Sequence, residues 1–287
     1  MFLSFRIHRF FGAVLSMVLL AFCFCGGTLA AVRQVEQSDG VKLPILMYHS
    51  VLKDAHAQGK YVVSPGTLES DFAWLNRNGY HTVVVQDLLD YVNGRVPLPE
   101  KPVMITFDDG FYNNYYYAYP IAKKYHAKIV ISPVGAYTDQ YTGGDADHPN
   151  YSYLTWGEIK EMMSSGVVEI QNHSYQMHSL RPRCGSKKMK RESTAAYQAA
   201  LRNDLGKMQR EMLEHTGYSP TAFVYPFGAV SEASVPVLRE MGFQASMNCM
   251  EKMNRITLDP ACLFGLGRYL RPAGLSSNSF FRGIGLS

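Results

Sequence analysis

Two adjacent carboxylates stand at the end of an apolar run in this sequence. Residues 103–107 read Val-Met-Ile-Thr-Phe, and Asp108, Asp109 and Gly110 follow directly. Such a run is typical of a strand buried on both faces, and barrel enzymes carry catalytic groups at the carboxyl ends of such strands. Neighbouring side chains of an extended strand point to opposite sides, so both carboxylates face one cavity only if the chain turns, as Gly110 permits. The structural alternative is that one aspartate caps the helix expected from Asn114.

Two histidines follow a second short apolar run, at residues 167–171. His173 and His178 stand five positions apart just beyond it. Imidazole nitrogens and a carboxylate oxygen suit Zn²⁺ or a similar transition ion, and three such ligands leave positions for water and substrate. A spacing of five does not place both rings on one helix face, so the pair must converge through a loop. The alternative is two surface histidines without a ligand.

A third apolar run, residues 222–225, is broken at once by proline and glycine. Pro226 has no backbone N–H, whereas Phe227 and Gly228 each have one. A free N–H at this position could receive the negative oxygen that develops in acyl transfer. An ordinary strand-to-helix turn is the alternative interpretation.

The elements that must position these residues alternate along the chain. Short apolar runs predict strands at 45–48, 82–85, 103–107, 128–132, 167–171, 222–225 and 243–246, and amphipathic patterns predict helices at 68–77, 87–92, 114–125, 156–165, 194–215 and 233–241. This alternation predicts parallel strands wrapped by helices, in one domain over residues 41–287.

Local signals support several of these boundaries. Thr155 and Glu158 have the spacing of a helix capping box, and Gly166 and Gly217 are placed to end two helices. Residues 137–153 predict a long loop rich in Gly, Asp and Tyr, which we expect to line a substrate groove.

The first 31 residues predict export. A short basic stretch is followed by an apolar run and then by small residues, the order of a secretory signal peptide, although the apolar run is also nearly long enough for an N-terminal membrane anchor. We therefore expect a secreted or extracytoplasmic protein, with membrane attachment if the segment is retained.

Composition and charge exclude several classes. With 47% hydrophobic and 18% charged residues the chain can form a folded core, and a net charge of +4 with one basic cluster, Lys187–Arg191, does not indicate nucleic-acid binding. Beyond the N-terminal segment, Cys184, Cys249 and Cys262 allow at most one internal disulfide and have no spacing for a structural zinc site.

The three segments together resemble the polysaccharide deacetylase family, carbohydrate esterases that share a NodB homology domain. Residues 106–110, Thr-Phe-Asp-Asp-Gly, match one family motif completely, and His173-Ser174 followed by His178 resembles a second. Residues 45–50 and 154–156 are similar to the branch that acts on poly-N-acetylglucosamine. The resemblance covers about residues 44–271 and implies an α/β fold, a distorted (β/α) barrel of about seven parallel strands.

The resemblance also implies roles for individual residues. Asp109, His173 and His178 would hold a divalent metal ion, most often Zn, with Co, Ni or Fe as alternatives. Asp108 would act as the general base on a metal-activated water. The Phe227 amide and the metal would then stabilise the tetrahedral oxyanion.

The sequence departs from the usual family pattern at two points. Val224 occupies the usual position of an arginine, and no histidine follows His215 to supply the usual general acid. For the acid we predict His49, at the end of the first strand, and for the residue that orients Asp108 either Arg268 or Arg271.

Aromatic residues suggest where a sugar would stack. Tyrosines are dense around the expected loop, and we predict Tyr225, Trp156 and Tyr141 as substrate-binding residues. The resulting hypothesis is a monomeric, exported, metal-dependent enzyme that removes N-acetyl groups from an N-acetylglucosamine polysaccharide. An O-acetyl esterase using the same metal site and an inactive carbohydrate-binding homologue are the alternatives.

Overall fold

Strands form within all seven apolar runs, although the run 82–85 contributes only Thr82 because Val85 already begins a helix. The computed structural model describes residues 40–144 and 147–287. The strands are β2 (Ile45–Tyr48), β5 (His81–Thr82), β6 (Pro102–Asp109), β7 (Ile129–Pro133), β8 (Val168–Ile170), β9 (Ala222–Val224) and β10 (Ala245–Met247). All the pairs that these strands make with one another are parallel, which confirms the predicted arrangement.

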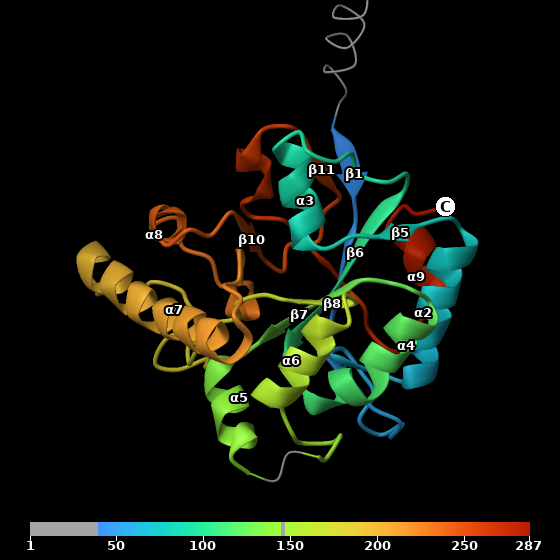
Figure 1. Ribbon diagram of the computed structural model, residues 1–287, viewed down its shortest axis with the longest axis horizontal. Coiled ribbons are helices and arrows are strands. Elements are labelled where there is room, and N and C mark those ends of the chain that lie inside the picture. Colours follow the sequence, from blue (N-terminus) through green and yellow to red (C-terminus); the bar gives the residue numbers. More distant parts are fainter. Residues whose placement is uncertain (1–39, 145–146) are drawn as a thin grey trace, which may run out of the picture. The chain divides into compact units, whose positions relative to one another are not determined.

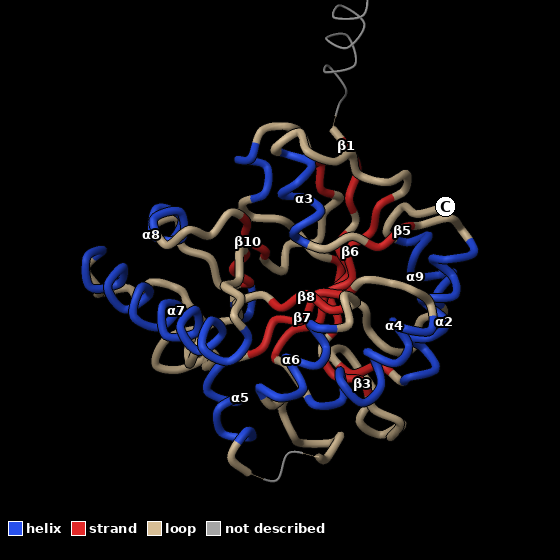
Figure 2. The backbone as a smooth tube through the Cα atoms, in the orientation of Figure 1, coloured by secondary structure: helices blue, strands red, loops and turns tan. Residues whose placement is uncertain are grey.

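The strands follow one another around an irregular ring. The largest sheet has the order β12-β2-β6-β7-β8, where β12 is Tyr269–Leu270, and β5 pairs with the start of β6. A parallel bridge between Asn172 and Phe223 links the end of β8 to β9, and another between Met247 and Leu266 links β10 to the segment that leads into β12. Figure 2 shows these strands at the centre with helices around them. The fold is therefore a distorted α/β barrel.

Helices cover the outside of the strands. They are α2 (Pro65–Arg77), α3 (Val85–Val92), α4 (Tyr119–Lys124), α5 (Gly135–Thr142), α6 (Trp156–Ser164), α7 (Thr194–Thr216), α8 (Ser234–Glu240) and α9 (Ser277–Gly283). In Figure 1, α2, α4 and α9 lie together on one side, and α5, α6 and α7 on another. The six helices predicted from the sequence are present, and α5 and α9 were not predicted.

The predicted helix ends have the expected causes. The Thr155 hydroxyl accepts from the Glu158 N–H, and the Glu158 carboxylate accepts from the Thr155 N–H, so the capping box of α6 is formed. Gly166 and Gly217 both have φ of +71°, the left-handed conformation that glycine adopts most easily.

Two segments differ from their predicted conformation. The first part of the expected loop 137–153 forms the last six of the eight residues of α5, whose Gly and Tyr content hides any helical pattern. The expected helix at 114–125 opens with a π-helical segment, Asn114–Ala118, before α4. Pro120 near the start of α4 has no N–H to donate to the preceding turn, which favours such an irregular start.

Short elements complete the described chain. β1 (Val41–Leu43) pairs antiparallel with β11 (Asn254–Ile256), and β3 (Ser50–Val51) pairs parallel with β4 (Val62–Val63). Two 3₁₀ helices, η2 (Pro226–Gly228) and η3 (Pro260–Leu263), follow β9 and β11.

A buried ion pair joins the last strand of the barrel to helix α2. Arg271 directly follows β12, and its Nε and Nη2 lie 2.8 and 3.1 Å from the two carboxylate oxygens of Asp71. The Tyr48 hydroxyl donates to the same carboxylate at 2.9 Å. Arg271 and Asp71 are both inaccessible to solvent, so this pair belongs to the packing of the fold.

Residues Val41–Ser287 form one compact unit. The predicted signal peptide or anchor, residues 1–31, lies outside the described residues. Among residues 40–144 and 147–287, the helices are too short or too polar to span a membrane. Cys184, Cys249 and Cys262 are free thiols, so the disulfide that the sequence allowed is not formed among them.

The turn after β6 leads to a stability prediction. A Cβ on Gly110 would lie 2.5 Å from Pro133 Cβ and 2.8 Å from Pro133 Cα, whereas one on Gly79 would meet nothing within 4 Å. The two glycines have nearly equal φ, +73° and +72°. Gly79→Ala should therefore lower the free energy of unfolding only by the strain of a left-handed alanine, about 1–2 kcal/mol. Gly110→Ala should cost about 1–3 kcal/mol more because Pro133 must move.

Urea unfolding of both variants measures this difference. Equal losses of unfolding free energy would show that β7 moves away from an added methyl group at no cost in stability. The close approach of Gly110 to Pro133 would then not constrain the end of β6.

Candidate metal and catalytic site

Asp108 and Asp109 face the same cavity because the backbone turns at the end of β6. Asp109 has φ of +72° and Gly110 has φ of +73°, so the extended conformation ends at Asp108. The chain therefore turns at the end of this strand, as the sequence required for both carboxylates to face one cavity. The cavity has a volume of about 810 Å³ and is lined by both aspartates, by His49, and by His173 and His178.

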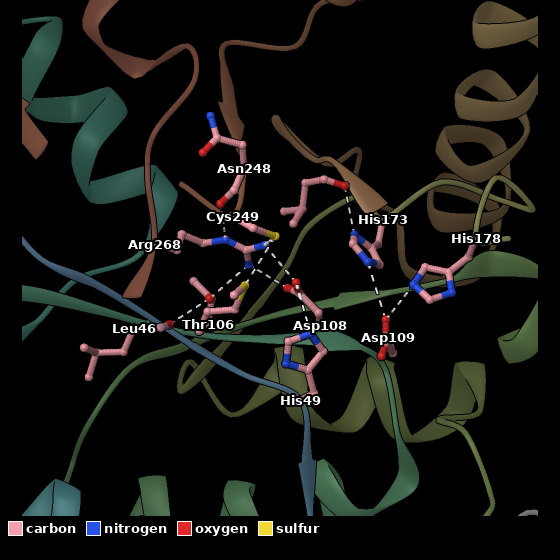
Figure 3. Close-up of polar contacts among 12 residues, drawn as sticks. Leu46, His49, Thr106, Asp108, Asp109, His173, His178, Asn248, Cys249 and Arg268 are labelled. Carbon is pink, nitrogen blue, oxygen red and sulfur yellow. Dashed lines mark hydrogen bonds and ion pairs between the residues drawn. The ribbon is translucent and has the colours of Figure 1, made fainter. Parts of the chain in front are cut away.

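Three side chains form a cluster suited to a metal ion. Asp109 Oδ1 lies 3.0 Å from His178 Nε2 and 3.5 Å from His173 Nε2. One ligand atom from each residue lies within 4.8 Å of the others. Figure 3 shows both imidazoles pointing at the Asp109 carboxylate. The structure therefore brings together the three residues that the sequence proposed as ligands.

The orientation of His173 favours metal binding. Its Nδ1 lies 2.8 Å from the backbone carbonyl of Val224, which can only accept a hydrogen bond. Nδ1 therefore carries a proton, and Nε2 is the ring nitrogen that faces Asp109 and would bind a metal ion. Two imidazoles and one carboxylate, with a second partner orienting one of the rings, fit a divalent transition ion.

The negative charge on Asp109 also favours binding of a metal ion. Burial opposes ionisation of this carboxyl, but hydrogen bonds from His173 and His178 outweigh burial and lower its pKa below the usual value. Asp109 is thus anionic under ordinary conditions, as a carboxylate metal ligand must be.

Asp108 has a different partner. Arg268 Nη1 and Nη2 lie 2.7 and 2.8 Å from the two Asp108 oxygens, a bidentate ion pair with both side chains buried. Burial raises the pKa of Asp108, and the Arg268 charge more than compensates, so the pKa is lowered. Asp108 stays outside the metal cluster, as proposed, but it is not free, because the guanidinium holds it (Figure 3).

The barrel core fixes Arg268 in turn. Its Nε donates to the Asn248 carbonyl at 3.0 Å, and its Nη1 lies 3.2 Å from the Thr106 hydroxyl. Of the two arginines considered from the sequence, Arg268 reaches Asp108. Arg271 does not, because its guanidinium is bound to Asp71 on the far side of β12.

Comparison with known proteins agrees with this geometry. The sequence profile of the polysaccharide deacetylase family matches residues 95–246, more than half of the chain. The chain belongs to the polysaccharide deacetylase family. The matched range contains the Asp108-Asp109 pair and both histidines of the cluster.

Several relatives carry this family's activity in their names. One is a poly-β-1,6-N-acetyl-D-glucosamine N-deacetylase of Escherichia coli K12, which is 29% identical over 217 residues. The aligned region covers 69% of this chain and 32% of that relative. A Staphylococcus aureus protein of the same name is 29% identical over 192 residues, covering 67% of this chain and 62% of the relative. The chain thus spans about a third of the E. coli protein and less than two thirds of the S. aureus protein.

Solved structures of the family share the fold. A de-N-acetylase from Aggregatibacter actinomycetemcomitans superposes with a TM-score of 0.73 at 26% identity, covering 85% of this chain and all of that one. IcaB from Ammonifex degensii superposes with a TM-score of 0.69 at 27% identity, covering 86% and 97%.

His49 lies beside Asp108 in the same cavity. Its Nε2 is 3.9 Å from Asp108 Oδ2, and its ring packs edge-on against Tyr61, with centroids 4.9 Å apart. Burial lowers the pKa of His49, although the negative charges of Asp108 and Asp109 oppose this. Its Nδ1 is buried and has no hydrogen-bond partner within the described part of the chain.

Phe227 forms part of the cavity wall. Its ring centroid lies 4.5 Å from that of His178, the side chain is 44% exposed, and its φ is +57°. With this left-handed backbone, the Phe227 ring lies against His178 of the metal cluster. Phe227 is therefore at the site where its amide was predicted to stabilise the oxyanion.

The three predicted sugar-binding aromatics lie elsewhere. Tyr225 is 1% exposed and its hydroxyl pairs with Ser234, and Trp156 is 4% exposed and donates to Asp139. Tyr141 is half-buried and donates to the Tyr151 carbonyl. Burial leaves Tyr225 and Trp156 no open ring face, so neither can stack on a sugar, and Tyr141 does not line the 810 Å³ cavity.

The cavity has other aromatic walls that the sequence did not indicate. Tyr61 and Phe111 line it together with Phe227. Tyr61 precedes a two-residue strand and Phe111 follows a turn, so no periodic pattern marked either of them. Phe111 is near the aspartates because it follows Asp109 by two residues, whereas tertiary packing alone brings Tyr61 to the cavity.

The geometry leads to a prediction about metal retention. Asp109→Ala and His173→Ala should each weaken Zn²⁺ binding by more than about 100-fold, because losing a ligand exceeds the effect of losing an outer-shell partner. Asp108→Asn should bind Zn²⁺ within about tenfold of the parent, because this carboxylate is held by Arg268 outside the cluster.

Metal-free protein titrated with Zn²⁺, with elemental analysis of the dialysed product, tests this. If Asp108→Asn loses the ion as fully as Asp109→Ala, the assignment of Asp109 rather than Asp108 as the ligand is wrong.

Proposed function

We propose that this protein is an exported, metal-dependent N-deacetylase of poly-β-1,6-N-acetylglucosamine. The observation that supports the proposal best is the pairing of a metal-binding cluster with a separate, ionised carboxylate in one cavity. Family membership supports the reaction class, and the names of the E. coli and S. aureus relatives support the polymer.

Asp109, His173 and His178 would hold the cation. When bound, a divalent ion supplies Lewis acidity, which makes water a stronger acid and an acetyl carbonyl a better electrophile. The residues around it supply the remaining steps of an amide hydrolysis.

Asp108 would accept the proton of the attacking water. Arg268 holds both of its oxygens, which keeps the carboxylate ionised and fixes its direction. Because the pair is buried, the geometry costs little reorganisation when the proton arrives.

His49 would protonate the departing amine. Amide nitrogen leaves poorly without a proton, so the reaction needs an acid on the leaving-group side. His49 Nε2 is 3.9 Å from Asp108 Oδ2, which supports a role for both groups at the same part of the cavity. The Phe227 amide, in the turn beside His178, is proposed to donate to the oxyanion.

The cavity suits a neutral sugar. Tyr61, Phe111 and Phe227 offer aromatic faces, on which pyranose rings stack. Export is proposed from residues 1–31, whose order of basic, apolar and small residues is that of a secretory signal or anchor.

Acetate release from β-1,6-linked N-acetylglucosamine oligomers tests this function. The parent should release acetate, and Asp108→Asn should lose about 10²–10⁴-fold in kcat, the usual contribution of a general base, while it keeps its metal. Turnover of Asp108→Asn at the parental rate would show that Asp108 is not the base.

A matched O-acetylated sugar separates the alternatives in the same assay. Release from the O-acetyl substrate alone would indicate an esterase, and metal and sugar binding without any release would indicate a binding protein.

The ion pair with Arg268 leads to a pH prediction. Since Asp108 must be ionised to accept a proton, and Arg268 lowers its pKa against the effect of burial, Arg268→Lys should raise that pKa. The acid limb of kcat/KM should then move to higher pH, and kcat should fall. Arg271→Lys is the matched control, because this equally buried arginine pairs with Asp71 and should leave the acid limb in place.

The pH profiles of kcat/KM for the parent and both variants measure the effect. An acid limb that does not move in Arg268→Lys, or moves equally in Arg271→Lys, contradicts the role given to Arg268.

A further inference from the structure

The segment between the two histidine ligands is bonded to a helix that contributes no ligand. Asp204 lies on α7, and its carboxylate oxygens accept the backbone N–H groups of Tyr175 and Gln176, each at 2.9 Å. These two N–H groups belong to consecutive residues in the loop between His173 and His178. One carboxylate therefore holds the middle of the loop that sets the separation of the two imidazoles.

The other edge of the same loop is held by α5. The N–H groups of Gly135 and Ala136 donate to the carbonyls of Ser174 and Tyr175 at 3.1 and 2.8 Å. Ser174 itself has φ of +73°, and its N–H donates to the Asn172 side chain at 2.8 Å. Both the backbone N–H groups and the backbone carbonyls of this loop are therefore hydrogen-bonded to neighbouring helices. Asp204 is the charged residue among these partners.

The two histidines depend on this loop to different degrees. His173 follows the barrel strand β8 closely, and the Val224 carbonyl fixes its ring. His178 lies at the far end of the loop, half-buried, with its ring between the rings of Tyr137 and Phe227. Displacement of the loop would therefore move His178 more than His173.

The side chain of Tyr175 provides an independent contact. Its hydroxyl donates to Asp139 of α5 at 2.8 Å, and the Lys207 ammonium lies 3.7 Å from the centre of its ring. These contacts hold the ring, whereas Asp204 holds the main chain. The two effects can be separated by mutation.

We propose that Asp204 is a positioning residue for the metal ligand His178. It fixes the backbone of residues 175 and 176 so that His178 Nε2 reaches Asp109 Oδ1. The inference rests on the metal site of the proposed function, and it assigns to α7 a role in building that site. A carboxylate suits the task, because each of its two oxygens can accept one of the two neighbouring N–H groups.

Titration of the metal-free protein with Co²⁺ tests the proposal without any substrate. Asp204→Ala should weaken Co²⁺ binding by about 10–100-fold, the usual effect of losing an outer-shell partner of a ligand. Its visible absorption should approach that of His178→Ala. Asp204→Asn, which keeps the volume but offers one acceptor oxygen, should show a smaller loss in the same direction.

Two controls separate positioning from general stability. Glu211→Ala removes another α7 carboxylate, whose oxygen lies 3.7 Å from His215, and Tyr175→Phe removes only the hydroxyl contact. Both should bind Co²⁺ within about twofold of the parent. Urea unfolding of every variant shows whether affinity and stability change together.

A double-mutant cycle decides the mechanism. If Asp204 acts through His178, then Asp204→Ala should have no further effect on Co²⁺ affinity in a His178→Ala background. Additive losses, or a loss of stability in Asp204→Ala with unchanged affinity, overturn the positioning role and leave the metal site intact. A parent protein that binds no Co²⁺ overturns both the metal site and this inference.

Discussion

The site depends on a backbone that stops being extended within two residues. At the end of β6 the chain passes from extended at Asp108 to left-handed at Asp109 and Gly110. Without that change, two neighbouring carboxylates would lie on opposite faces of the strand. A left-handed non-glycine residue costs free energy, and at Asp109 the close packing of Gly110 against Pro133 on the neighbouring strand opposes relaxation of the turn.

Placing two anions side by side creates a second requirement. Each carboxylate is buried, and an unpaired buried charge is costly. The protein meets this by giving each its own partners: the two imidazoles for Asp109 and the guanidinium for Asp108. This separation also divides the chemistry, because the first set can bind a metal ion and the second keeps a base ionised.

The arginine that holds Asp108 comes from an unexpected part of the chain. The usual family position carries Val224, whose carbonyl orients His173. Arg268, just before β12, supplies the guanidinium instead, and it reaches Asp108 because the segment 266–270 closes the barrel beside β2. The chemical group at Asp108 is thus supplied from a different sequence position, which works because both positions lie near the carboxyl end of β6.

The sequence by itself determined the elements and the ligand types. Strands formed within the seven apolar runs, only at Thr82 in the run 82–85, and six amphipathic stretches became helices, because burial on both faces or on one face leaves a recognisable pattern in the residues. The Asp-Asp-Gly turn and the two histidines could be identified because their chemistry is local. Only the tertiary structure decided which of Arg268 and Arg271 pairs with Asp108. It also determined that Tyr225 and Trp156 are buried, that Tyr61 lines the cavity, and that Asp204 binds the loop between His173 and His178. These outcomes depend on contacts between residues far apart in the chain, and such contacts leave no spacing or periodicity from which they can be predicted.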